Sequence, residues 1–296
     1  MSIEIRKAER FKAKLRLGLA GPSGAGKTMS ALKLAKGLGG KICMIDTERG
    51  SGDLYANLYD YDIITLKPPY TPKYYTDAIK AAEEAGYDVI IIDSLTHAWA
   101  DEGGLLDQAD KKSNNGGNKY TVWAELTPQH RSLVNAMLNS SAHIVATVRS
   151  KQAYEMEEYT DARGNKKTKP VKLGMAPVQR EGMEYEFTVF MDIEQNHCAH
   201  TSKDRTDMFK DEVFVIDEST GTRLIDWLNI GIEKPKDTTM QRKLIAIQLK
   251  KIGHTCVTTA EYEQTTLKET ELELKEENFN EIIRRLGIRV EEIKVR

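Results

Sequence analysis

Eight consecutive residues near the N-terminus have the types and spacing of a phosphate-binding loop. They match the pattern G-x-x-x-x-G-K-[ST] without a mismatch, and they are Gly21, Pro22, Ser23, Gly24, Ala25, Gly26, Lys27 and Thr28. The glycines let backbone N–H groups close around a phosphate, where a Cβ would intrude. The lysine of such a loop reaches the β- and γ-phosphates, and the hydroxyl of its last residue coordinates Mg²⁺. The stretch therefore predicts binding of ATP together with Mg²⁺.

The segments on either side of this loop agree with that interpretation. Residues 15–20 form an apolar, strand-like run, and residues 29–36 are good helix formers. A helix that starts directly after the loop points its positive end at the phosphate. We therefore add Met29, which opens the helical run, to the predicted nucleotide-binding residues. Strand, glycine loop and helix together make an ordinary glycine-rich turn the less favoured alternative.

A second set of acidic residues follows the next predicted strand. Residues 41–46 read as a buried strand that leads into Thr47-Glu48-Arg49-Gly50. Side chains at the carboxyl edge of a parallel strand face the ligand crevice in open α/β sheets. Glu48 is placed there to orient and deprotonate an attacking water, although Asp46, two residues earlier, shares its face on an extended chain. Either carboxylate is a candidate base, and a solvated loop acid is the less favoured reading of Glu48.

An apolar run ending in aspartate marks a third strand at the same edge. Residues 87–94 contain four consecutive β-branched residues followed by Asp93, which is the pattern of a Walker B strand. Asp93 would hold Mg²⁺ through its water shell, next to Thr28. The phosphate-binding loop about 65 positions upstream makes this common pattern specific.

Two further segments are candidates for DNA contact. Residues 101–119 read as a mobile, glycine-rich loop with the basic pair Lys111 and Lys112, followed by a helix over 121–138 in which Pro128 predicts a kink or a split. A strand over 142–149 follows, and Thr147 or Arg149 at its end is placed to sense the γ-phosphate.

Residues 150–174 lack a stable apolar pattern, and their basic side chains alternate with Tyr154 and Tyr159. Basic groups for the backbone and aromatic rings for stacking are typical of single-strand binding. A solvated surface hairpin around Arg163 fits the same residues, but their position after a core strand favours DNA. The candidate contacts are Lys151, Arg163, Lys166, Lys167 and Lys169.

Composition limits the remaining possibilities. The chain has 296 residues and a formal net charge of −2, so any affinity for DNA must come from local basic segments. Its three cysteines are far apart and form no C-x-x-C pair, which suits a reducing cytoplasm. No stretch approaches the roughly 20 apolar residues of a membrane span, and the N-terminus does not resemble a signal peptide. We expect a cytoplasmic protein with no membrane partner.

The C-terminal part of the chain differs in composition from the rest. Strands are expected over 186–193, 197–202 and 213–216, and a helix over 222–229 ends the core. The Lys- and Glu-rich remainder has helical spacing over 239–252, 259–269 and 275–287, with Gly253 and Gly287 as stops. We predict a core domain over 1–233, a linker over 234–238 and a small helical domain over 239–296.

The order of these motifs resembles the RecA-type recombinase ATPases, and the first 230 or so residues are most similar to phage-encoded RecA-like ATPases linked to single-strand annealing and homologous recombination. The resemblance rests on the phosphate-binding loop, residues 44–48, the Walker B strand and Lys203-Asp204-Arg205. It implies an α/β fold: a RecA-like P-loop NTPase core with a mainly parallel central sheet, plus the small C-terminal helical domain. It also implies that Glu48 is the catalytic glutamate, and that Lys203 and Arg205 reach the γ-phosphate of a neighbouring subunit.

The functional expectation is an ATP- and Mg²⁺-dependent ATPase that assembles as a filament or ring on single-stranded DNA and promotes annealing or strand exchange. A single-strand-binding protein is a further candidate partner, and a phage-encoded protein would act in the cytoplasm of the host cell. Two alternatives remain. One is a nucleotide-switched module that binds a protein and not DNA, and the other is a helicase or packaging motor with the same core. Steep salt dependence of DNA binding would exclude the first.

Overall fold

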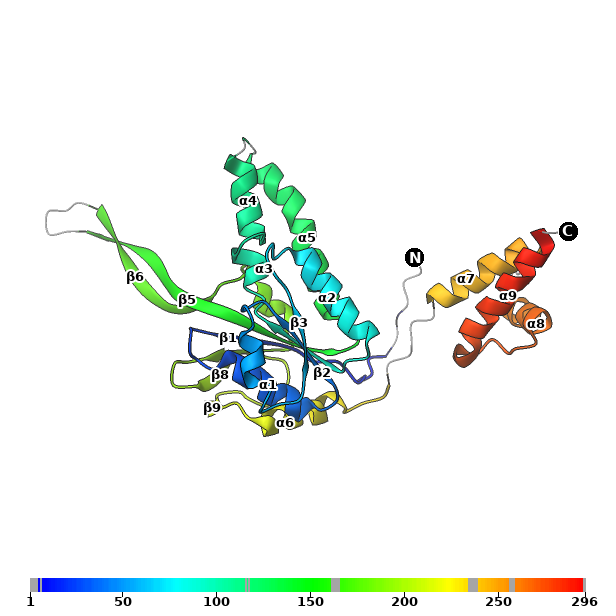
Figure 1. The fold of residues 1–296 in the computed structure, drawn as a ribbon, viewed down its shortest axis with the longest axis horizontal. Helices are drawn as coiled ribbons and strands as arrows, with labels where there is room; N and C mark the ends of the chain where they lie inside the picture. The colour runs from blue at the N-terminus through cyan, green and yellow to red at the C-terminus, as the bar shows by residue number, and fades with distance from the viewer. Residues whose placement is uncertain are drawn as a thin grey trace. The chain divides into compact units, whose positions relative to one another are not determined.

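A computed structural model describes residues 5, 7–114, 116, 118–160, 166–233, 239–255 and 259–294. The chain divides into two compact units, which span residues 1–232 and residues 233–296. The first unit holds the sheet, and the second is built from helices (Figure 1).

The sheet of the first unit has the strand order β3-β2-β4-β5-β1-β7-β8-β9, with β6 paired to β5. Pairing is parallel from β3 through to β7, and antiparallel at β7–β8, β8–β9 and β5–β6. This confirms the predicted α/β fold with a mainly parallel central sheet, the arrangement of a RecA-like P-loop core. The strands are β1 (Arg16–Gly21), β2 (Ile42–Asp46), β3 (Asp62–Thr65), β4 (Val89–Asp93), β5 (His143–Thr160), β6 (Lys166–Pro177), β7 (Val189–Ile193), β8 (Cys198–Asp204) and β9 (Phe214–Val215).

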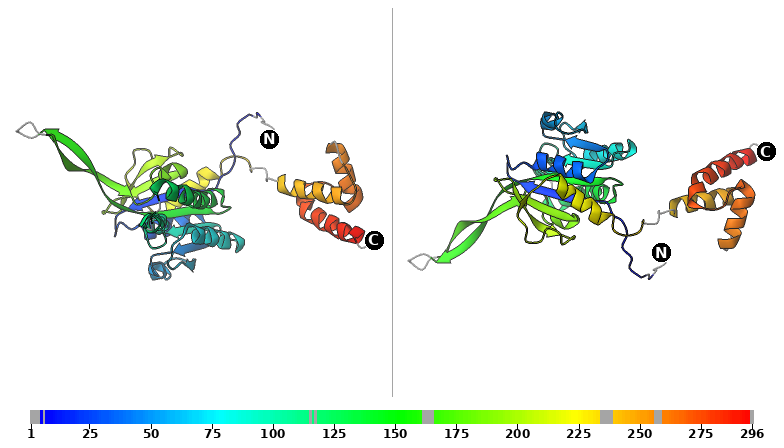
Figure 2. Two further views of the ribbon diagram at one scale, coloured as in Figure 1. Left: turned by 90° about the horizontal axis from the view of Figure 1, so that it is seen from above. Right: turned by 90° about the horizontal axis from the view of Figure 1, so that it is seen from below.

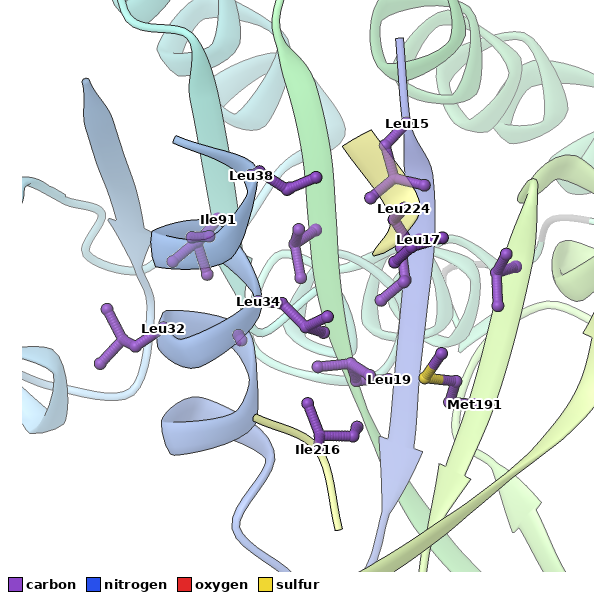
Figure 3. Close-up of a cluster of buried hydrophobic side chains, with 14 of the residues drawn as sticks. Leu15, Leu17, Leu19, Leu32, Leu34, Leu38, Ile91, Met191, Ile216 and Leu224 are labelled. Carbon is purple, nitrogen blue, oxygen red and sulfur yellow. The ribbon is translucent and has the colours of Figure 1, made fainter. Parts of the chain in front are cut away.

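Both faces of this sheet are covered. Side chains alternate between the faces along a strand, so Leu17 and Leu19 of β1 belong to the same buried cluster as Leu34 of α1 and Leu224 of α6 (Figure 3). The opposite face packs against α2 and α5. The helices of the unit are α1 (Lys27–Leu38), α2 (Pro72–Glu84), α3 (His97–Ala100), α4 (Leu105–Asn114), α5 (Lys119–Asn139) and α6 (Glu218–Leu228), with short 3₁₀ turns η1 (Ser51–Tyr55) and η2 (Met183–Glu186).

The parallel register brings the chemically interesting strand ends to one edge of the sheet. Gly21 at the end of β1 is paired with Arg149 of β5, and Asp46 at the end of β2 is paired with Asp93 of β4. The phosphate-binding loop, both acidic strand ends and the polar residues of β5 therefore meet at the same edge, as open α/β sheets require of a ligand site.

Two parts of the first unit differ from the sequence prediction. The segment 101–119 was expected to be a mobile loop, but Leu105–Asn114 forms α4, which packs on α5 through Leu105, Ala109 and Leu126. Apolar residues spaced three to four apart bury one face of α4 despite the polar run around them. The helix α5 runs through Pro128 without a split.

The strand expected over 142–149 is much longer in the structure. β5 continues without interruption to Thr160 and pairs with β6, so that the two strands form an antiparallel ribbon that extends away from the sheet (Figures 1 and 2). We call the part of this hairpin beyond Ser150 the β5–β6 ribbon. A two-stranded ribbon outside the central sheet need not alternate apolar and polar residues as a core strand does, which explains why its sequence reads as irregular.

The second unit contains α7 (Thr239–Lys251), α8 (Thr259–Thr270), η3 (Glu276–Asn278) and α9 (Phe279–Lys294). Its core is small and consists of Ile245, Leu249, Phe279, Ile282 and Leu286. Gly287 was expected to end the last helix, but α9 continues past it to Lys294. Among the described helices of both units, none combines the length and the apolar composition that a membrane span needs.

Helices α1 and α6 approach each other through glycines. A Cβ on Gly37 would lie 1.9 Å from the backbone oxygen of Glu218, and one on Gly221 would lie 2.3 Å from the backbone oxygen of Leu34. Neither contact is with the flexible end of a side chain, so the two helices cannot accommodate even one methyl group here without moving apart.

We therefore expect Gly37→Ala to lower the free energy of unfolding of the first unit by about 1–3 kcal/mol, because overpacking outweighs the gain in helix propensity. Chemical denaturation followed by tryptophan fluorescence measures this, since Trp99, Trp123 and Trp227 all lie in this unit. Gly287→Ala is the control, because the nearest atom to its Cβ would be 3.8 Å away; circular dichroism should show unchanged or higher stability there. Equal effects of both substitutions would contradict the packing explanation.

Candidate active site

The phosphate-binding loop connects β1 to α1 in a shape that leaves backbone donors available. Gly26, the residue before α1, has φ 87°, in the left-handed region that favours glycine. It has no side chain to cap the helix, and the first turn of α1 contains no acidic residue. The N–H groups at the start of α1 are therefore not satisfied by a side-chain cap and can bind an anion, which the helix dipole favours.

Lys27 lies across the loop that it follows. Its Nζ donates a hydrogen bond to the carbonyl oxygen of Pro22 at 2.8 Å. Burial lowers the pKa of Lys27, while the nearby carboxylates of Asp93 and Glu48 act in the opposite direction. The ammonium is thus held at the mouth of the loop, beside the site where phosphates would bind.

Thr28 and Asp93 come together as the sequence predicts for a Mg²⁺ site. The Thr28 hydroxyl donates to Oδ2 of Asp93 at 2.6 Å, and the Thr147 hydroxyl donates to Oδ1 at 2.5 Å. Asp93 is almost fully buried, and burial raises its pKa although both hydroxyl bonds oppose this. A hydroxyl and a carboxylate oxygen are hard donors of the kind Mg²⁺ prefers, so these residues fit the ion. Burial disfavours the negative charge of the Asp93 carboxylate, and a bound Mg²⁺ ion would neutralise that charge.

Thr147 has a different position from the one expected of a γ-phosphate sensor. Its side chain is fully buried beneath Asp93, and its hydroxyl is used to hold that carboxylate. Arg149, two residues further along β5, is exposed and lies at the edge of the site. Of the two candidates, only Arg149 has a side chain at the surface of the site.

The two candidate bases, Asp46 and Glu48, differ in their hydrogen bonds. Asp46 is fully buried, and its two carboxylate oxygens accept from the backbone N–H groups of Glu48 at 2.7 Å and Gly50 at 2.8 Å. Asp46 therefore fixes the turn after β2. The Glu48 side chain remains partly exposed and directed to the strand edge, where a water could reach it.

Glu48 forms a two-point ion pair with Arg149. The Arg149 Nε donates to Oε1 at 3.0 Å, and its Nη2 donates to Oε2. Burial is the largest single influence on the pKa of Glu48 and raises it, but the hydrogen bond and the charge of Arg149 outweigh burial, so the pKa lies below its ordinary value. A carboxylate paired in this way at both oxygens is a poor base until its partner moves.

The sequence reasoning did not identify Thr47 and His97, which lie directly behind Glu48. His97 is the first residue of α3, four positions after Asp93, and its Nδ1 is 2.7 Å from the Thr47 hydroxyl oxygen. The His97 ring also stacks on Tyr70, with centroids 5.1 Å apart. The only signal in the sequence was the position of His97 four residues after the Walker B aspartate, and that spacing alone does not predict a functional role.

Lys203 and Arg205 are not near the phosphate-binding loop of their own chain. Lys203 donates to the carbonyl oxygens of Glu184, at 3.2 Å, and of Tyr185, and Arg205 donates to the Tyr185 oxygen at 3.1 Å. The backbone of Arg205 bonds to Thr188, which in turn bonds to Arg16 at the start of β1. Arg16 is five residues before Gly21, so the two ends of β1 are about 16 Å apart along the strand.

The basic residues predicted to contact DNA lie in two different parts of the first unit, the α4–α5 pair and the β5–β6 hairpin. Lys111 bonds to Asp107 at 2.7 Å and Lys112 to Glu125, both at the surface of the α4–α5 pair. Lys151 is exposed at the base of the β5–β6 ribbon. Arg163 lies outside the described residues, as do the side chains of Lys166, Lys167 and Lys169.

A cavity of about 930 Å³ adjoins the phosphate-binding loop on the side of the ribbon. It is lined by residues from the end of β1, the base of the ribbon and the end of β7. Its walls include Gly21, Pro22, Ser150, Met175, Gln179 and Asp192.

The loop, the paired Thr28 and Asp93 side chains and the strand order are those of a P-loop ATPase. Residues 13–220, more than half of the chain, match the protein family described as AAA domain, and the chain belongs to that family. No curated protein matches the chain. Among solved structures, a chain from a study of a prototypical ATPase of the type III secretion system of pathogenic bacteria is similar at 13% identity and a TM-score of 0.36, covering 93% of this chain and 80% of that one.

Proposed function

We propose that this chain is an ATP- and Mg²⁺-dependent DNA-binding ATPase of the phage recombination type, acting in the host-cell cytoplasm. It assembles as a filament or ring on single-stranded DNA and promotes annealing or homologous recombination. One observation carries the proposal: β5 contributes residues to the ATPase site and then continues, as the same strand, into the ribbon with the basic residues.

The geometry of β5 supports coupling between ATP and DNA. Thr147 holds Asp93, and Arg149 holds Glu48, while Lys151 is only two residues further along the strand. A strand rises about 3.3 Å per residue, so the first basic residue of the ribbon lies roughly 7 Å from Arg149 along the chain. Movement of Arg149 toward a γ-phosphate would therefore shift the base of the ribbon directly.

The composition of the β5–β6 ribbon supports a nucleic-acid partner. Lys151 and Lys172 are exposed, and the sequence between them adds further basic residues and two tyrosines. Single-strand binding combines basic groups along the backbone with aromatic rings on which bases stack. A ribbon that extends from the sheet suits contact with an extended strand of DNA, and a single-strand-binding protein would bind that same DNA.

The residues at the sheet edge have complementary roles in hydrolysis. A water oxygen attacks the γ-phosphorus in line, the bond from that phosphorus to the bridging oxygen breaks, and ADP leaves. Glu48 orients this water and takes its proton, while Lys27 and the loop N–H groups hold the phosphates. Bound Mg²⁺ supplies neutralising charge next to Thr28 and Asp93. Arg149 leaves Glu48 for the γ-phosphate, so that ATP binding itself frees the base.

Assembly completes the site in this proposal. Arg205 is level with the start of β1 and Lys203 with Gly18, and both side chains donate to the backbone of η2 and not to their own phosphate-binding loop, which favours a role toward a neighbouring subunit. A cation supplied across a subunit interface stabilises the charge of the transferring phosphoryl group. Hydrolysis would then depend on oligomerisation on DNA.

The direct test is ATP hydrolysis with and without single-stranded DNA by the full chain and by a ribbon-deletion variant. Ala153 and Gly174 are paired across the ribbon, so residues 154–173 can be replaced by an Asn-Gly turn that matches a two-residue hairpin. We expect the full chain to be stimulated by DNA, and the variant to keep basal hydrolysis but lose the stimulation. The affinity of the full chain for DNA should fall steeply with salt.

Other outcomes have defined meanings. DNA-independent hydrolysis by the full chain would contradict the proposal and favour a nucleotide-switched, protein-binding module. Stimulation that survives in the ribbon-deletion variant would exclude the ribbon as the DNA contact. Unwinding of a duplex with a single-stranded tail would favour a helicase or packaging motor.

A further inference from the structure

The imidazole of His97 is buried behind the carboxylate of Glu48 in a position that the hydrolysis scheme above leaves unused. His97 has a side-chain exposure of 4%, and its Nε2 lies 3.7 Å from Oε1 of Glu48 and 3.5 Å from Oδ2 of Asp101. Among the described residues, this Nε2 is one of only a few buried polar side-chain atoms without a hydrogen-bond partner. An unmade hydrogen bond at such a site is costly, so a buried donor with no partner needs an explanation.

The contacts of Thr47 assign the tautomer of His97. The Thr47 hydroxyl oxygen already accepts from the Ser94 backbone N–H at 2.8 Å, and its shortest contact is with Nδ1 of His97 at 2.7 Å. The other candidate acceptors of the hydroxyl proton, the carbonyl oxygens of Asp93 and Ser94, are both 3.2 Å away. Donation to Nδ1 is the shortest of the three contacts open to the hydroxyl proton, and on that ground we assign the proton of the neutral ring to Nε2.

The opposite tautomer would be unfavourable. It would direct the lone pair of Nε2 at two carboxylates, whereas the assigned tautomer directs an N–H at them. Burial lowers the pKa of His97, against the influence of the carboxylates, so the ring stays neutral near pH 7. The group behind Glu48 is thus an uncharged N–H donor, which can hold a carboxylate without suppressing its basicity as strongly as a guanidinium does.

The present partner of Glu48 blocks both of its oxygens. Arg149 binds Oε1 and Oε2 together, and Oε1 is also the atom closest to His97. A general base must keep one oxygen free for the water and have the other fixed, because a small misplacement of a reacting group costs rate steeply. When Arg149 departs, a movement of well under 1 Å brings Oε1 within hydrogen-bond range of Nε2.

We propose that His97 is a positioning residue for hydrolysis: its Nε2–H holds Oε1 of Glu48 once Arg149 has left, which leaves Oε2 to take the proton of the attacking water. The Thr47 hydroxyl donates to Nδ1 and so keeps the ring proton on Nε2. The Tyr70 ring, which stacks on the imidazole, holds the plane of the imidazole. The inference rests on the proposed role of Glu48 as the base and adds the group that orients it.

Two isosteric substitutions separate this role from a structural one. The amide nitrogen of a glutamine overlies Nε2 of histidine, and the side-chain amide of an asparagine overlies Nδ1. His97→Gln therefore keeps a donor toward Glu48, while His97→Asn keeps a partner for Thr47 and loses that donor. We expect His97→Asn to lower kcat about 10²-fold and His97→Gln to lower it no more than about threefold. KM and the affinity for a fluorescent ATP analogue should change little in either variant.

The measurements are steady-state hydrolysis and nucleotide binding by the full chain, with circular dichroism to verify folding. Equal losses in the two variants, or a greater loss in a folded His97→Gln, would show that the ring serves packing only and would overturn the proposal. If His97→Asn does not fold, a loss of kcat well beyond about threefold in a folded His97→Gln still overturns the proposal. Glu48→Gln is measured in parallel: full activity there would refute the role of Glu48 itself, whereas its loss together with unchanged His97 variants refutes only the inference about His97.

Discussion

A chain carrying Lys203→Ala together with Arg205→Ala is expected to bind ATP normally but to hydrolyse it about 10³–10⁵ times more slowly, the range that a cation supplied to a transferring phosphoryl group contributes. Both side chains donate to backbone carbonyls of η2 and not to the phosphate-binding loop of their own chain. Removing them should therefore leave nucleotide affinity unchanged. Hydrolysis and fluorescent-nucleotide binding, measured side by side, check this result.

Subunit mixing tests whether the two residues act across an interface. A Lys27→Ala chain lacks a working phosphate site but still supplies Lys203 and Arg205, whereas the double variant has the reverse defect. Neither should hydrolyse ATP alone, and a mixture should regain activity. A chain with Lys36→Ala and Lys210→Ala, which loses the same charge at exposed positions, is the control and should be fully active. Wild-type turnover in the double variant would exclude the proposed role.

Glu48→Gln is expected to lower kcat by about 10²–10⁴-fold, because an amide cannot take the proton of the attacking water. The substitution keeps the size of the side chain, and its oxygen can still accept one bond from Arg149. ATP binding should persist or strengthen, since Arg149 is held less tightly and is freer to reach the γ-phosphate. Single-turnover hydrolysis together with nucleotide binding measures both effects.

Asp46→Asn provides the contrast for this prediction. Asp46 accepts two backbone N–H bonds in the turn after β2 and is fully buried, so its loss should destabilise that turn rather than remove a base. The effect should therefore appear in the free energy of unfolding. Normal kcat in Glu48→Gln with a large loss in a folded Asp46→Asn would reverse the assignment of the base.

The parts of the site that sequence reasoning could anticipate are those encoded within a few residues of one another. The loop from Gly21 to Thr28 has a fixed spacing, and a strand that ends in Asp93 has a recognisable pattern. The parallel sheet follows from strands that alternate with helices, and it places strand ends at one edge. Those rules were sufficient for the fold class and for the meeting of Thr28 with Asp93.

The contacts that control the site lie between distant residues, and a single sequence does not reveal them. Glu48 and Arg149 are 101 positions apart, and Thr147 is 54 positions from Asp93. Their partnership follows from the register of β5 against β1 and β4, which is set by the packing of the whole sheet. The buried His97 was missed for the same reason, because its neighbour Thr47 is 50 positions away.

Local signals also failed where tertiary packing outweighed them. Gly287 would be a plausible helix end, yet α9 passes through it because Phe279, Ile282 and Leu286 bury one face in the core of the second unit. In the same way, the glycines and polar residues of 101–119 suggested a loop, while α4 is stabilised by its contact with α5. Helical propensity is a weak guide when an apolar face is available to pack.

The glycine contact between α1 and α6 has a consequence for how the protein emerges from the ribosome. α1 follows the phosphate-binding loop and ends at Leu38, but the helix that packs against it ends only at Leu228, 190 residues later. At a translation rate of about 5–20 residues per second, α6 would be synthesised roughly 10–40 s after α1. Nascent chains that end before Leu228 should therefore expose the apolar face of α1 to chaperones and should not retain ATP.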